Sequence, residues 1–196
     1  EYTVNSTIDT SPGFRRFGRF TIRDHRNYGV LDLTEIIVKS SNVGVSNIAT
    51  DLGGDTLRNL YARLGLGQAT GIGFPGEAVG VLPAPPKWRP VEESTLSYGY
   101  GMSVNALQLA QAYMVIANGG IRYPLSLMRQ EQRPQGQRVL SEQVTRAVRD
   151  MLKQAVARGT GKRARPGLYA AGGKTGTVHL VGANGYEDSQ YKAIFA

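Results

Sequence analysis

Apolar residues in the first third of the chain recur with the spacing of helices. Asp32, followed three places later by Glu35, has the form of an N-terminal capping pair, and the apolar run 36–38 comes directly after it. The polar residues 39–42 compete for backbone hydrogen bonds and interrupt the pattern, which resumes over 43–49. The pattern therefore predicts two helices with a polar junction between them.

Further helices are expected downstream, separated by a long irregular segment. The second helix stops at the glycines 53–54, and a third follows over 55–64 because its apolar positions keep helical spacing. Residues 65–101 are rich in Gly and Pro and carry little periodicity, so we expect an irregular connection of the kind that is usually functional. Two more helices are predicted, one over 103–117 and one that opens at Ser141.

The last part of the chain changes from helical spacing to two strand candidates. Residues 172–181 and 191–196 form these runs, and the turn residues 182–185 between them predict a hairpin. Helices come first and antiparallel strands last, which predicts an α+β fold with helices packed on an antiparallel sheet. Because the chain starts without Met and stops within a strand-like run, we expect a piece of a larger protein, incomplete at both ends.

The composition narrows the possible classes of protein. With 41% apolar residues among 196, the chain can build a packed core, which excludes a disordered or low-complexity segment. The absence of Cys removes disulfides, thiolate zinc sites and cysteine nucleophiles, and the two isolated histidines do not supply a catalytic zinc site. No apolar run approaches the roughly 18 residues of a membrane span. We therefore expect a globular domain that uses neither a metal nor another cofactor.

The net charge of +8 is concentrated near one predicted helix. Residues 141–166 hold seven Lys or Arg and two Asp or Glu. A nucleic-acid surface is one interpretation. A solvated helix face followed by a basic loop is preferred, because no aromatic residue lies among these charges to stack on bases. We therefore do not expect nucleic acid as a partner.

Two nucleotide-binding patterns are also present but lack their structural context. Residues 71–76 match G-x-G-x-x-G, yet they follow a predicted helix and contain Pro75, whereas the dinucleotide fingerprint lies where a strand turns into a helix. Residues 173–175 end like a phosphate-binding loop, but Leu168 occupies the position where that loop needs Gly. Neither pattern predicts a cofactor.

Two short motifs with a defined order and separation carry the chemistry. Residues 40–42 have the form S-x-N at the predicted helical junction, and residues 174–177 have the form K-T-G-T on a predicted strand. Each alone could be a cap or a turn. Their order and their separation of 134 residues indicate a shared site.

Additional loop motifs make the pattern much more specific. With the two short motifs, the informative segments are 39–45, Gly65-Leu66-Gly67, Gly73-Phe74-Pro75-Gly76-Glu77, Ser97-Tyr98-Gly99-Tyr100-Gly101 and Gly173-Lys174-Thr175-Gly176-Thr177. Together with the two short motifs, they resemble the penicillin-binding protein transpeptidase domain, and in particular the class B, division-type enzymes called penicillin-binding protein 3. The resemblance covers essentially the whole chain and implies the α+β fold of penicillin-binding proteins and serine β-lactamases, with residues 1–196 as a partial transpeptidase domain.

The chain departs from the family in one respect that bears on mechanism. The S-x-x-K tetrad, which carries the nucleophilic serine and its lysine, precedes S-x-N by about fifty residues in the family, and only 39 residues precede Ser40 here. We therefore expect the tetrad upstream of Glu1. The match at Ser189 and Lys192 comes after K-T-G-T, and its two side chains would point to opposite faces of a strand, so we regard it as chance.

The resemblance implies acyl transfer through a serine ester, with peptidoglycan stem peptides ending in D-alanyl-D-alanine as substrate and β-lactam antibiotics as inhibitors. Ser40 would relay a proton between a lysine and the leaving amine, and Asn42 would donate to the amide carbonyl of the substrate. Lys174 would bring positive charge toward this proton relay and toward the anionic substrate. Without the nucleophile, the 196-residue chain alone is expected to be inactive.

The K-T-G-T strand is expected to hold the substrate. Alternation along a strand puts the hydroxyls of Thr175 and Thr177 on one face, where both could bind the terminal carboxylate. Gly176 would let a peptide lie close to the strand edge, and the backbone N–H of Thr177 would donate to the oxyanion. Tyr100 resembles the aromatic wall of the family's substrate pocket, with a buried core tyrosine as the alternative.

The resemblance also implies a biological setting. It implies septal cell-wall synthesis at the periplasmic face of the bacterial inner membrane, an anchoring N-terminal helix outside this chain, and contacts with other division proteins through parts outside the chain. A β-lactam-sensing domain and a serine β-lactamase share the fold and remain alternatives. Residues 158–173 contain no acid that could serve in deacylation, which disfavours the β-lactamase alternative.

Overall fold

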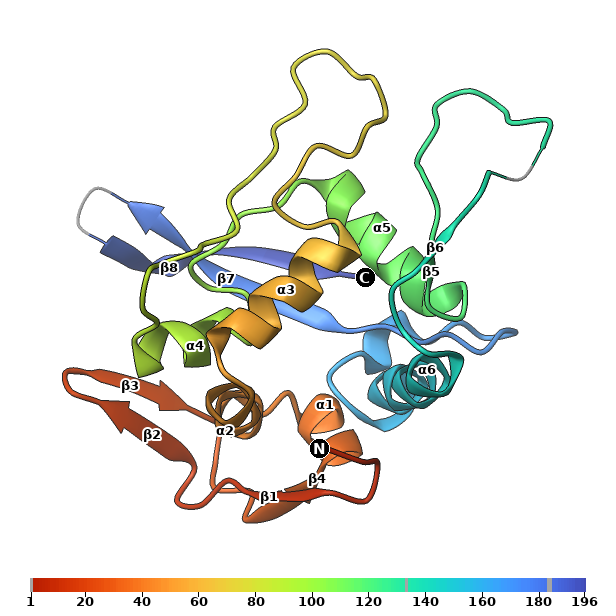
Figure 1. Cartoon of the computed structure of the whole chain (residues 1–196). Helices are drawn as coiled ribbons and strands as arrows, with labels where there is room; N and C mark the ends of the chain where they lie inside the picture. The colour runs from red at the N-terminus through yellow and green to blue at the C-terminus, as the bar shows by residue number, and fades with distance from the viewer. Residues whose placement is uncertain (1, 133, 183–184) are drawn as a thin grey trace.

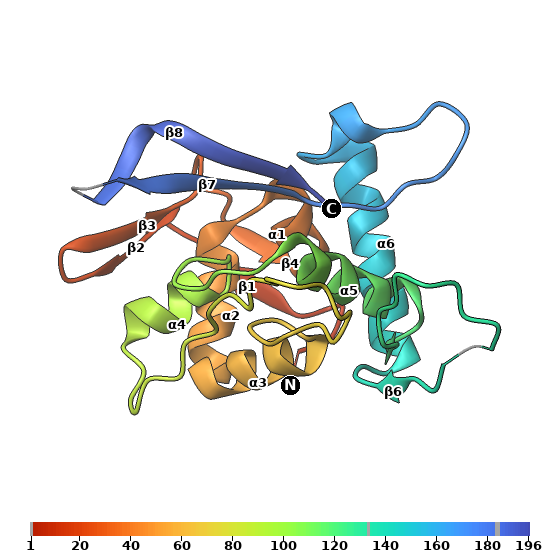
Figure 2. The same cartoon turned by 90° about the horizontal axis from the view of Figure 1, so that it is seen from above.

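The computed structural model describes residues 2–132, 134–182 and 185–196, and it describes their side chains except over 180–190. Its helices form a central layer, and a long β-hairpin crosses that layer on one side: the hairpin passes behind the helices in Figure 1 and lies along one edge of them in Figure 2. The helices are α1 (Leu33–Lys39), α2 (Asn42–Leu52), α3 (Gly54–Leu64), α4 (Pro90–Leu96), α5 (Ala106–Ala117), α6 (Glu142–Arg158) and the 3₁₀ helix η1 (Lys162–Ala164).

The strands pair two by two, always antiparallel. The pairs are β1 with β4, β2 with β3, β5 with β6 and β7 with β8, which agrees with the predicted α+β class. The strands are β1 (Thr7–Asp9), β2 (Phe14–Phe17), β3 (Phe20–Arg23), β4 (Val30–Asp32), β5 (Ile121–Arg122), β6 (Gln137–Arg138), β7 (Thr175–Gly182) and β8 (Gly185–Phe195).

The β7–β8 hairpin confirms the predicted pairing of the last two strands. Its register runs from Thr175 opposite Phe195 to Gly182 opposite Gly185, with an irregularity between residues 179 and 181. β7 begins three residues later than predicted and β8 six residues earlier. Residues 183–184 of the predicted turn lie outside the described residues.

The predicted break between the first two helices is confirmed. The Asp32 side chain accepts a hydrogen bond from the backbone N–H of Glu35 at 2.7 Å and caps α1. α1 ends at Lys39, and the Ser41 side chain caps α2 by accepting from the N–H of Gly44 at 2.9 Å. Ser40 lies between the two helices as the C-cap of α1.

The hydrophobic core lies where the helices meet. One fully buried side chain from each of four helices marks it, and burial of such a side chain stabilises the fold by roughly 1.5–3 kcal/mol. Within the described residues no helix is long and apolar enough to cross a membrane. The four core side chains are Ile36 of α1, Leu96 of α4, Val115 of α5 and Val156 of α6.

The segment 65–101 is less irregular than predicted, because α4 lies inside it. Pro90 occupies the first turn of α4, where its missing N–H costs no hydrogen bond, and the Glu92 carboxylate accepts from the N–H of Arg89 at 2.9 Å. This start signal was present in the sequence but hidden by the surrounding Gly and Pro. The helix predicted from residue 103 begins at Ala106, because Asn105 is its N-cap.

Candidate active site

The backbone at the helical junction is unusual at Ser40. Its φ of 57° and ψ of 49° place it in the left-handed region, and among the described residues it is the one non-glycine with positive φ. That conformation costs an L-residue roughly 1–2 kcal/mol. Ser41 N–H donates to the carbonyl of Ile36 at 3.0 Å, so the strained turn closes the end of α1. Strain of this kind is concentrated at functional sites.

Asp24, directly after β3, fixes the α2 side of the junction between α1 and α2. The Ser41 hydroxyl donates to an Asp24 carboxylate oxygen at 2.5 Å, and the other Asp24 oxygen accepts from the N–H of Val43 at 3.0 Å. Asp24 follows β3 directly and thus holds the start of α2 against that strand. The sequence gives no signal of this contact, because Asp24 lies outside any capping pattern for α2.

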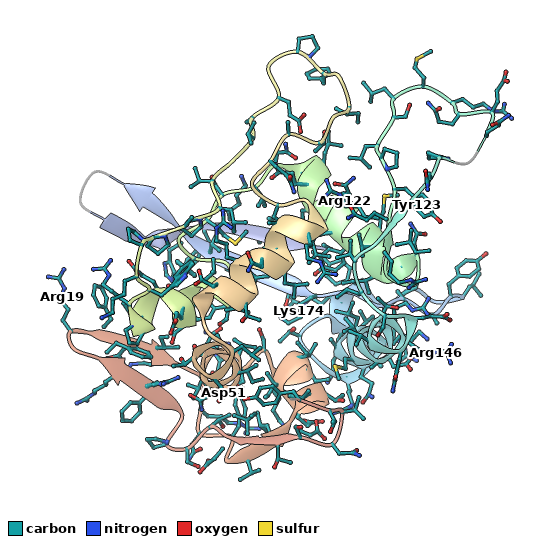
Figure 3. All side chains as sticks on the ribbon, in the orientation of Figure 1. Arg19, Asp51, Arg122, Tyr123, Arg146 and Lys174 are labelled. Atoms are coloured by element: carbon teal, nitrogen blue, oxygen red, sulfur yellow. The ribbon has the colours of Figure 1, made fainter. Side chains whose placement is uncertain are left out.

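Lys174 reaches the junction from the far end of the sequence. Its Nζ donates to Ser40 Oγ at 2.8 Å and to the carbonyl oxygen of Thr175 at 2.9 Å. This confirms the predicted proximity of Ser40 and Lys174, and Figure 3 shows Lys174 near the centre of the molecule. Burial lowers the pKa of the Lys174 ammonium below its usual value, because desolvation disfavours the charged form.

One edge of β7, next to Ser40 and Lys174, is not paired with β8. Lys174 and Ala196 exchange both backbone hydrogen bonds, at 2.8 and 3.2 Å. In an antiparallel ladder the backbone groups of the next residue point away from the partner strand, and those of the residue after it point back again. The N–H and C=O groups of Thr175 and Thr177 therefore lie on the edge of β7 that β8 leaves open. The Thr175 carbonyl that accepts from Lys174 agrees with this assignment.

Tyr100 lies at the same edge. Its hydroxyl accepts a hydrogen bond from the backbone N–H of His179 at 3.4 Å, and His179 is the next residue after Thr177 whose N–H points outward. The Tyr100 ring meets the ring of Tyr98 edge to face, with centroids 5.6 Å apart. The half-buried Tyr100 is thus placed against the strand that carries K-T-G-T rather than inside the helical core.

The three substrate-binding residues predicted on β7 differ in their surroundings. The Thr175 hydroxyl donates to the hydroxyl of Thr160 at 2.9 Å, in the turn after α6. Thr177 is exposed, and a Cβ placed on Gly176 would meet no atom within 4 Å. The surface over Gly176 and Thr177 is therefore open, as the approach of a peptide requires.

Asn42 takes a different partner from the one expected. It occupies the first turn of α2, and its side-chain Nδ2 donates to the carbonyl oxygen of Arg23 at 3.3 Å. In the described part of the chain no hydrogen bond joins Asn42 to Ser40 or Lys174. Its amide lies at the end of β3, where it borders the site.

A carboxylate links α1 to α6 beside the site. Glu35 accepts from Lys39 one turn further along α1, and it also pairs with Arg158 at the end of α6. The hydrogen bond from Lys39 is the largest cause that lowers the pKa of the Glu35 carboxyl. The helices approach closely here, because a Cβ on Gly159 would lie 2.5 Å from the carbonyl oxygen of Val38.

These contacts form a closed ring that includes Ser40 and Lys174. Ser40, which follows Lys39, accepts a hydrogen bond from Lys174. The next residue, Thr175, donates a hydrogen bond to Thr160. Thr160 follows α6 by two residues, and the last residue of α6 pairs with Glu35. The ring joins α1, α6 and β7. The pairing of Glu35 with Arg158 was not predicted, because nothing in a sequence marks which distant arginine a carboxylate will meet.

The chain belongs to the penicillin-binding protein transpeptidase family. The model of the "Penicillin binding protein transpeptidase domain" matches residues 2–196, and a solved structure of the transpeptidase domain of Burkholderia pseudomallei penicillin-binding protein 3 is similar. That structure has a TM-score of 0.92 and 39% identity, covering 98% of this chain and 59% of the other. A Mycobacterium penicillin-binding protein 3, complexed with aztreonam, has a TM-score of 0.85 and 33% identity, covering 94% and 46%.

Curated proteins similar to this chain include peptidoglycan D,D-transpeptidases. The chain is 36% identical to the probable peptidoglycan D,D-transpeptidase PbpC of Pseudomonas aeruginosa, over 100% of this chain and 35% of that protein. It is 38% identical to the peptidoglycan D,D-transpeptidase FtsI of Escherichia coli K12, over 98% of this chain and 32% of that protein. The chain thus spans about a third of the length of these relatives.

Proposed function

We propose that this chain is the part of a division-type peptidoglycan D,D-transpeptidase that supplies the proton relay, the carboxylate site and an oxyanion donor. The observation that carries the proposal is the hydrogen bond of 2.8 Å between Lys174 Nζ and Ser40 Oγ at the open edge of β7. Family membership and the transpeptidase relatives support the same activity. The nucleophilic serine and its lysine belong to an S-x-x-K segment upstream of residue 1.

The reaction proceeds in two acyl transfers. The upstream serine oxygen attacks the penultimate D-alanine carbonyl and gives up its proton, which reaches the leaving nitrogen through the Ser40 hydroxyl. D-Alanine leaves and the serine ester remains. An amine of a neighbouring stem peptide then attacks the ester, and its proton returns to the serine oxygen by the same route. Lys174 orients the Ser40 hydroxyl by donating to its oxygen, which leaves the hydroxyl proton available for transfer.

The stem peptide lies along the free edge of β7 as an added strand. Gly176 leaves room for its backbone, and the outward N–H of Thr177 donates to the oxyanion. The hydroxyls of Thr175 and Thr177 hold the terminal carboxylate, with Thr175 exchanging its bond to Thr160 for one to the substrate. Tyr100 walls the pocket at the His179 end, and Asn42 turns from Arg23 to the substrate carbonyl.

β-Lactams acylate the same serine and block the site. The penicillin-binding protein 3 solved in complex with aztreonam supports this part of the proposal. We place the protein at the periplasmic face of the bacterial inner membrane, anchored by a helix outside this chain, where it crosslinks septal peptidoglycan with other division proteins. A β-lactam-sensing domain or a serine β-lactamase of the same fold is the alternative, and slow rather than fast release of a bound penicillin would exclude the β-lactamase.

Labelling with a fluorescent penicillin tests the proposal directly. The 196-residue chain alone should form no covalent adduct, because the nucleophilic serine of the S-x-x-K tetrad is not among its residues and Ser40 serves as the proton relay. A protein that also includes the upstream segment should be labelled on the serine of its S-x-x-K tetrad. Mass spectrometry that located the adduct on Ser40, Ser41 or Ser189 would contradict the three-motif mechanism.

A further inference from the structure

The hairpin of β2 and β3, with the turn that follows it, is rich in arginine and aromatic residues. Residues 14–28 contain five Arg, three Phe and one Tyr, and Asp24 is their single acid. The basic segment 141–166 differs, because no aromatic side chain lies among its charges. The arginines of the hairpin therefore have a kind of neighbour that those of α6 lack.

The strand register sorts these side chains into two faces. Directly opposed residues share a face, so Arg15 and Ile22 lie on one side. Ile22 is buried, and the Arg15 guanidinium donates to Ser46, Asn47 and Thr50 of α2 at 2.9–3.2 Å. This inner face anchors the hairpin to α2.

The outer face presents guanidinium groups to solvent. Arg16 and Arg23 place their Cζ atoms 5.3 and 5.4 Å from the centre of the Phe14 ring, and both arginines are exposed. Cation–π contacts of this kind hold the groups in place without neutralising their charge. At the tip, Arg19 lies over Phe20 at 5.1 Å and projects from the end of the hairpin (Figure 3).

These charges have no counter-ion within the described part of the chain. No salt bridge there involves Arg16, Arg19 or Arg23. Asp24 is bound to Ser41 and to the N–H of Val43 and so serves the cap of α2. The outer face is thus a cluster of exposed guanidinium groups whose positions are set by aromatic contacts.

The outer face begins at the border of the active site. The carbonyl oxygen of Arg23 accepts from Asn42, so the inner end of β3 touches the S-x-N motif. The β2–β3 and β7–β8 hairpins project from the same side of the molecule in both views (Figures 1 and 2). A long substrate that leaves the open edge of β7 on that side extends toward the side of the molecule from which the β2–β3 hairpin also projects.

We propose that Arg16 and Arg23, with Arg19 at the tip, bind carboxylate groups of the peptidoglycan strand that carries the reacting stem peptide. Guanidinium groups pair with carboxylates through two parallel hydrogen bonds, and each stem peptide carries free carboxylates. The inference rests on the proposed function and extends it from the peptide terminus to the strand. A β-lactam is too small to span both regions, so its reaction does not depend on this face.

The test separates strand binding from acylation. The intact protein is first acylated with penicillin to close the active site, and the binding of fluorescent, uncrosslinked peptidoglycan strands is then measured by anisotropy at two salt concentrations. In the double variant R16E/R23E the affinity should fall at least about tenfold and depend less on salt. Strands whose carboxylates have been amidated should bind the unaltered protein about as weakly.

The control double variant R129E/R146E makes the same change in net charge. Arg129 and Arg146 are exposed, and Figure 3 shows Arg146 on the opposite side of the molecule from Arg19. We expect the control to bind strands within about twofold of the unaltered protein, since its arginines are not part of the β2–β3 hairpin and salt screens exposed charges from one another over distance. An equal loss in both variants would show that only net charge matters and would overturn the proposal.

Two further outcomes decide between explanations. R16E/R23E should acylate with penicillin at a rate within about twofold of the unaltered protein, which shows that it is folded; if it does not, R16Q/R23Q replaces it. Unchanged strand binding in a folded variant overturns the proposal. Binding to vesicles of anionic phospholipid is measured in parallel, and a variant that loses affinity for the vesicles but keeps its affinity for strands also overturns it. If even the unaltered protein fails to acylate, the proposed function fails instead.

Discussion

The S-x-N junction and the K-T-G-T strand reach the same site by different means. Ser40 is fixed by the caps of two helices and carries a strained backbone. Thr177 instead pairs with Ala193 of β8, and Lys174 pairs with Ala196 just after that strand, so the backbone of both is held along one edge. The junction has few ways to move. The strand turns the backbone N–H and C=O groups of Thr177 away from β8, where another chain can pair with them. One half of the site is therefore preset for proton transfer, and the other is left unfilled for substrate.

Ser40 offers the strongest test of the preset half. Ser40→Ala in the intact protein should slow penicillin acylation by about 10²- to 10⁴-fold, because a proton-transfer group is lost. Ser40→Gly should lose as much activity while raising the free energy of unfolding, since Gly adopts the left-handed conformation without strain. Stopped-flow acylation and urea unfolding measure the two effects. A Gly variant near normal activity would show that the hydroxyl has no part in the reaction.

Thr177 tests the open half. Thr177→Val should keep the fold and weaken acylation by roughly 10- to 1000-fold, as expected when a carboxylate or oxyanion contact is disturbed. Val178→Thr, on the opposite face of the same strand, is the matched control and should change the rate far less. Acylation rates within about twofold of the unaltered protein would assign Thr177 to packing.

The ring of contacts predicts that changes at Glu35 and Arg158, which do not touch Ser40 directly, slow acylation by a smaller factor. Glu35→Gln and Arg158→Gln should each slow acylation several-fold by loosening Ser40, and the double variant should be no slower than the worse single one, because the two residues act as one unit. The exposed pair of Glu142 and Arg146 provides the control, and its loss should leave the rate unchanged. Additive losses at Glu35 and Arg158 would contradict a shared positioning effect.

Lys174 gives the smallest and most specific effect, a pH dependence of stability. Burial lowers its pKa in the folded state, so the unfolded chain binds more protons between that pKa and the usual value of 10.5. The free energy of unfolding contributed by this group therefore rises with pH across that window and is lowest below it. Urea unfolding should show this rise in the unaltered protein and not in Lys174→Met. A rise of equal slope in the variant would assign it to other groups.

Much of the fold follows from local sequence patterns. Asp32 with Glu35 marks the start of α1 through a hydrogen bond that spans three residues, and this start was predicted. The break before α2 was predicted from the polar residues 39–42, although the cap by Ser41 was not. α4 was missed because one Pro and one Glu among many loop residues gave too weak a signal. The site was predicted in part. The order and separation of S-x-N and K-T-G-T indicated that Ser40 and Lys174 meet, and the structure confirms it.

The sequence by itself determined which residues share a strand face, where helices stop, and the family to which the motifs point. Only the tertiary structure decided that the outward edge of β7 carries the N–H of Thr177, that Ser40 lies in the left-handed region, and that Glu35 meets Arg158. Caps and alternation depend on neighbours a few residues apart, which a sequence displays directly. Edge exposure and distant ion pairs depend on which elements pack together, and that outcome belongs to the whole chain.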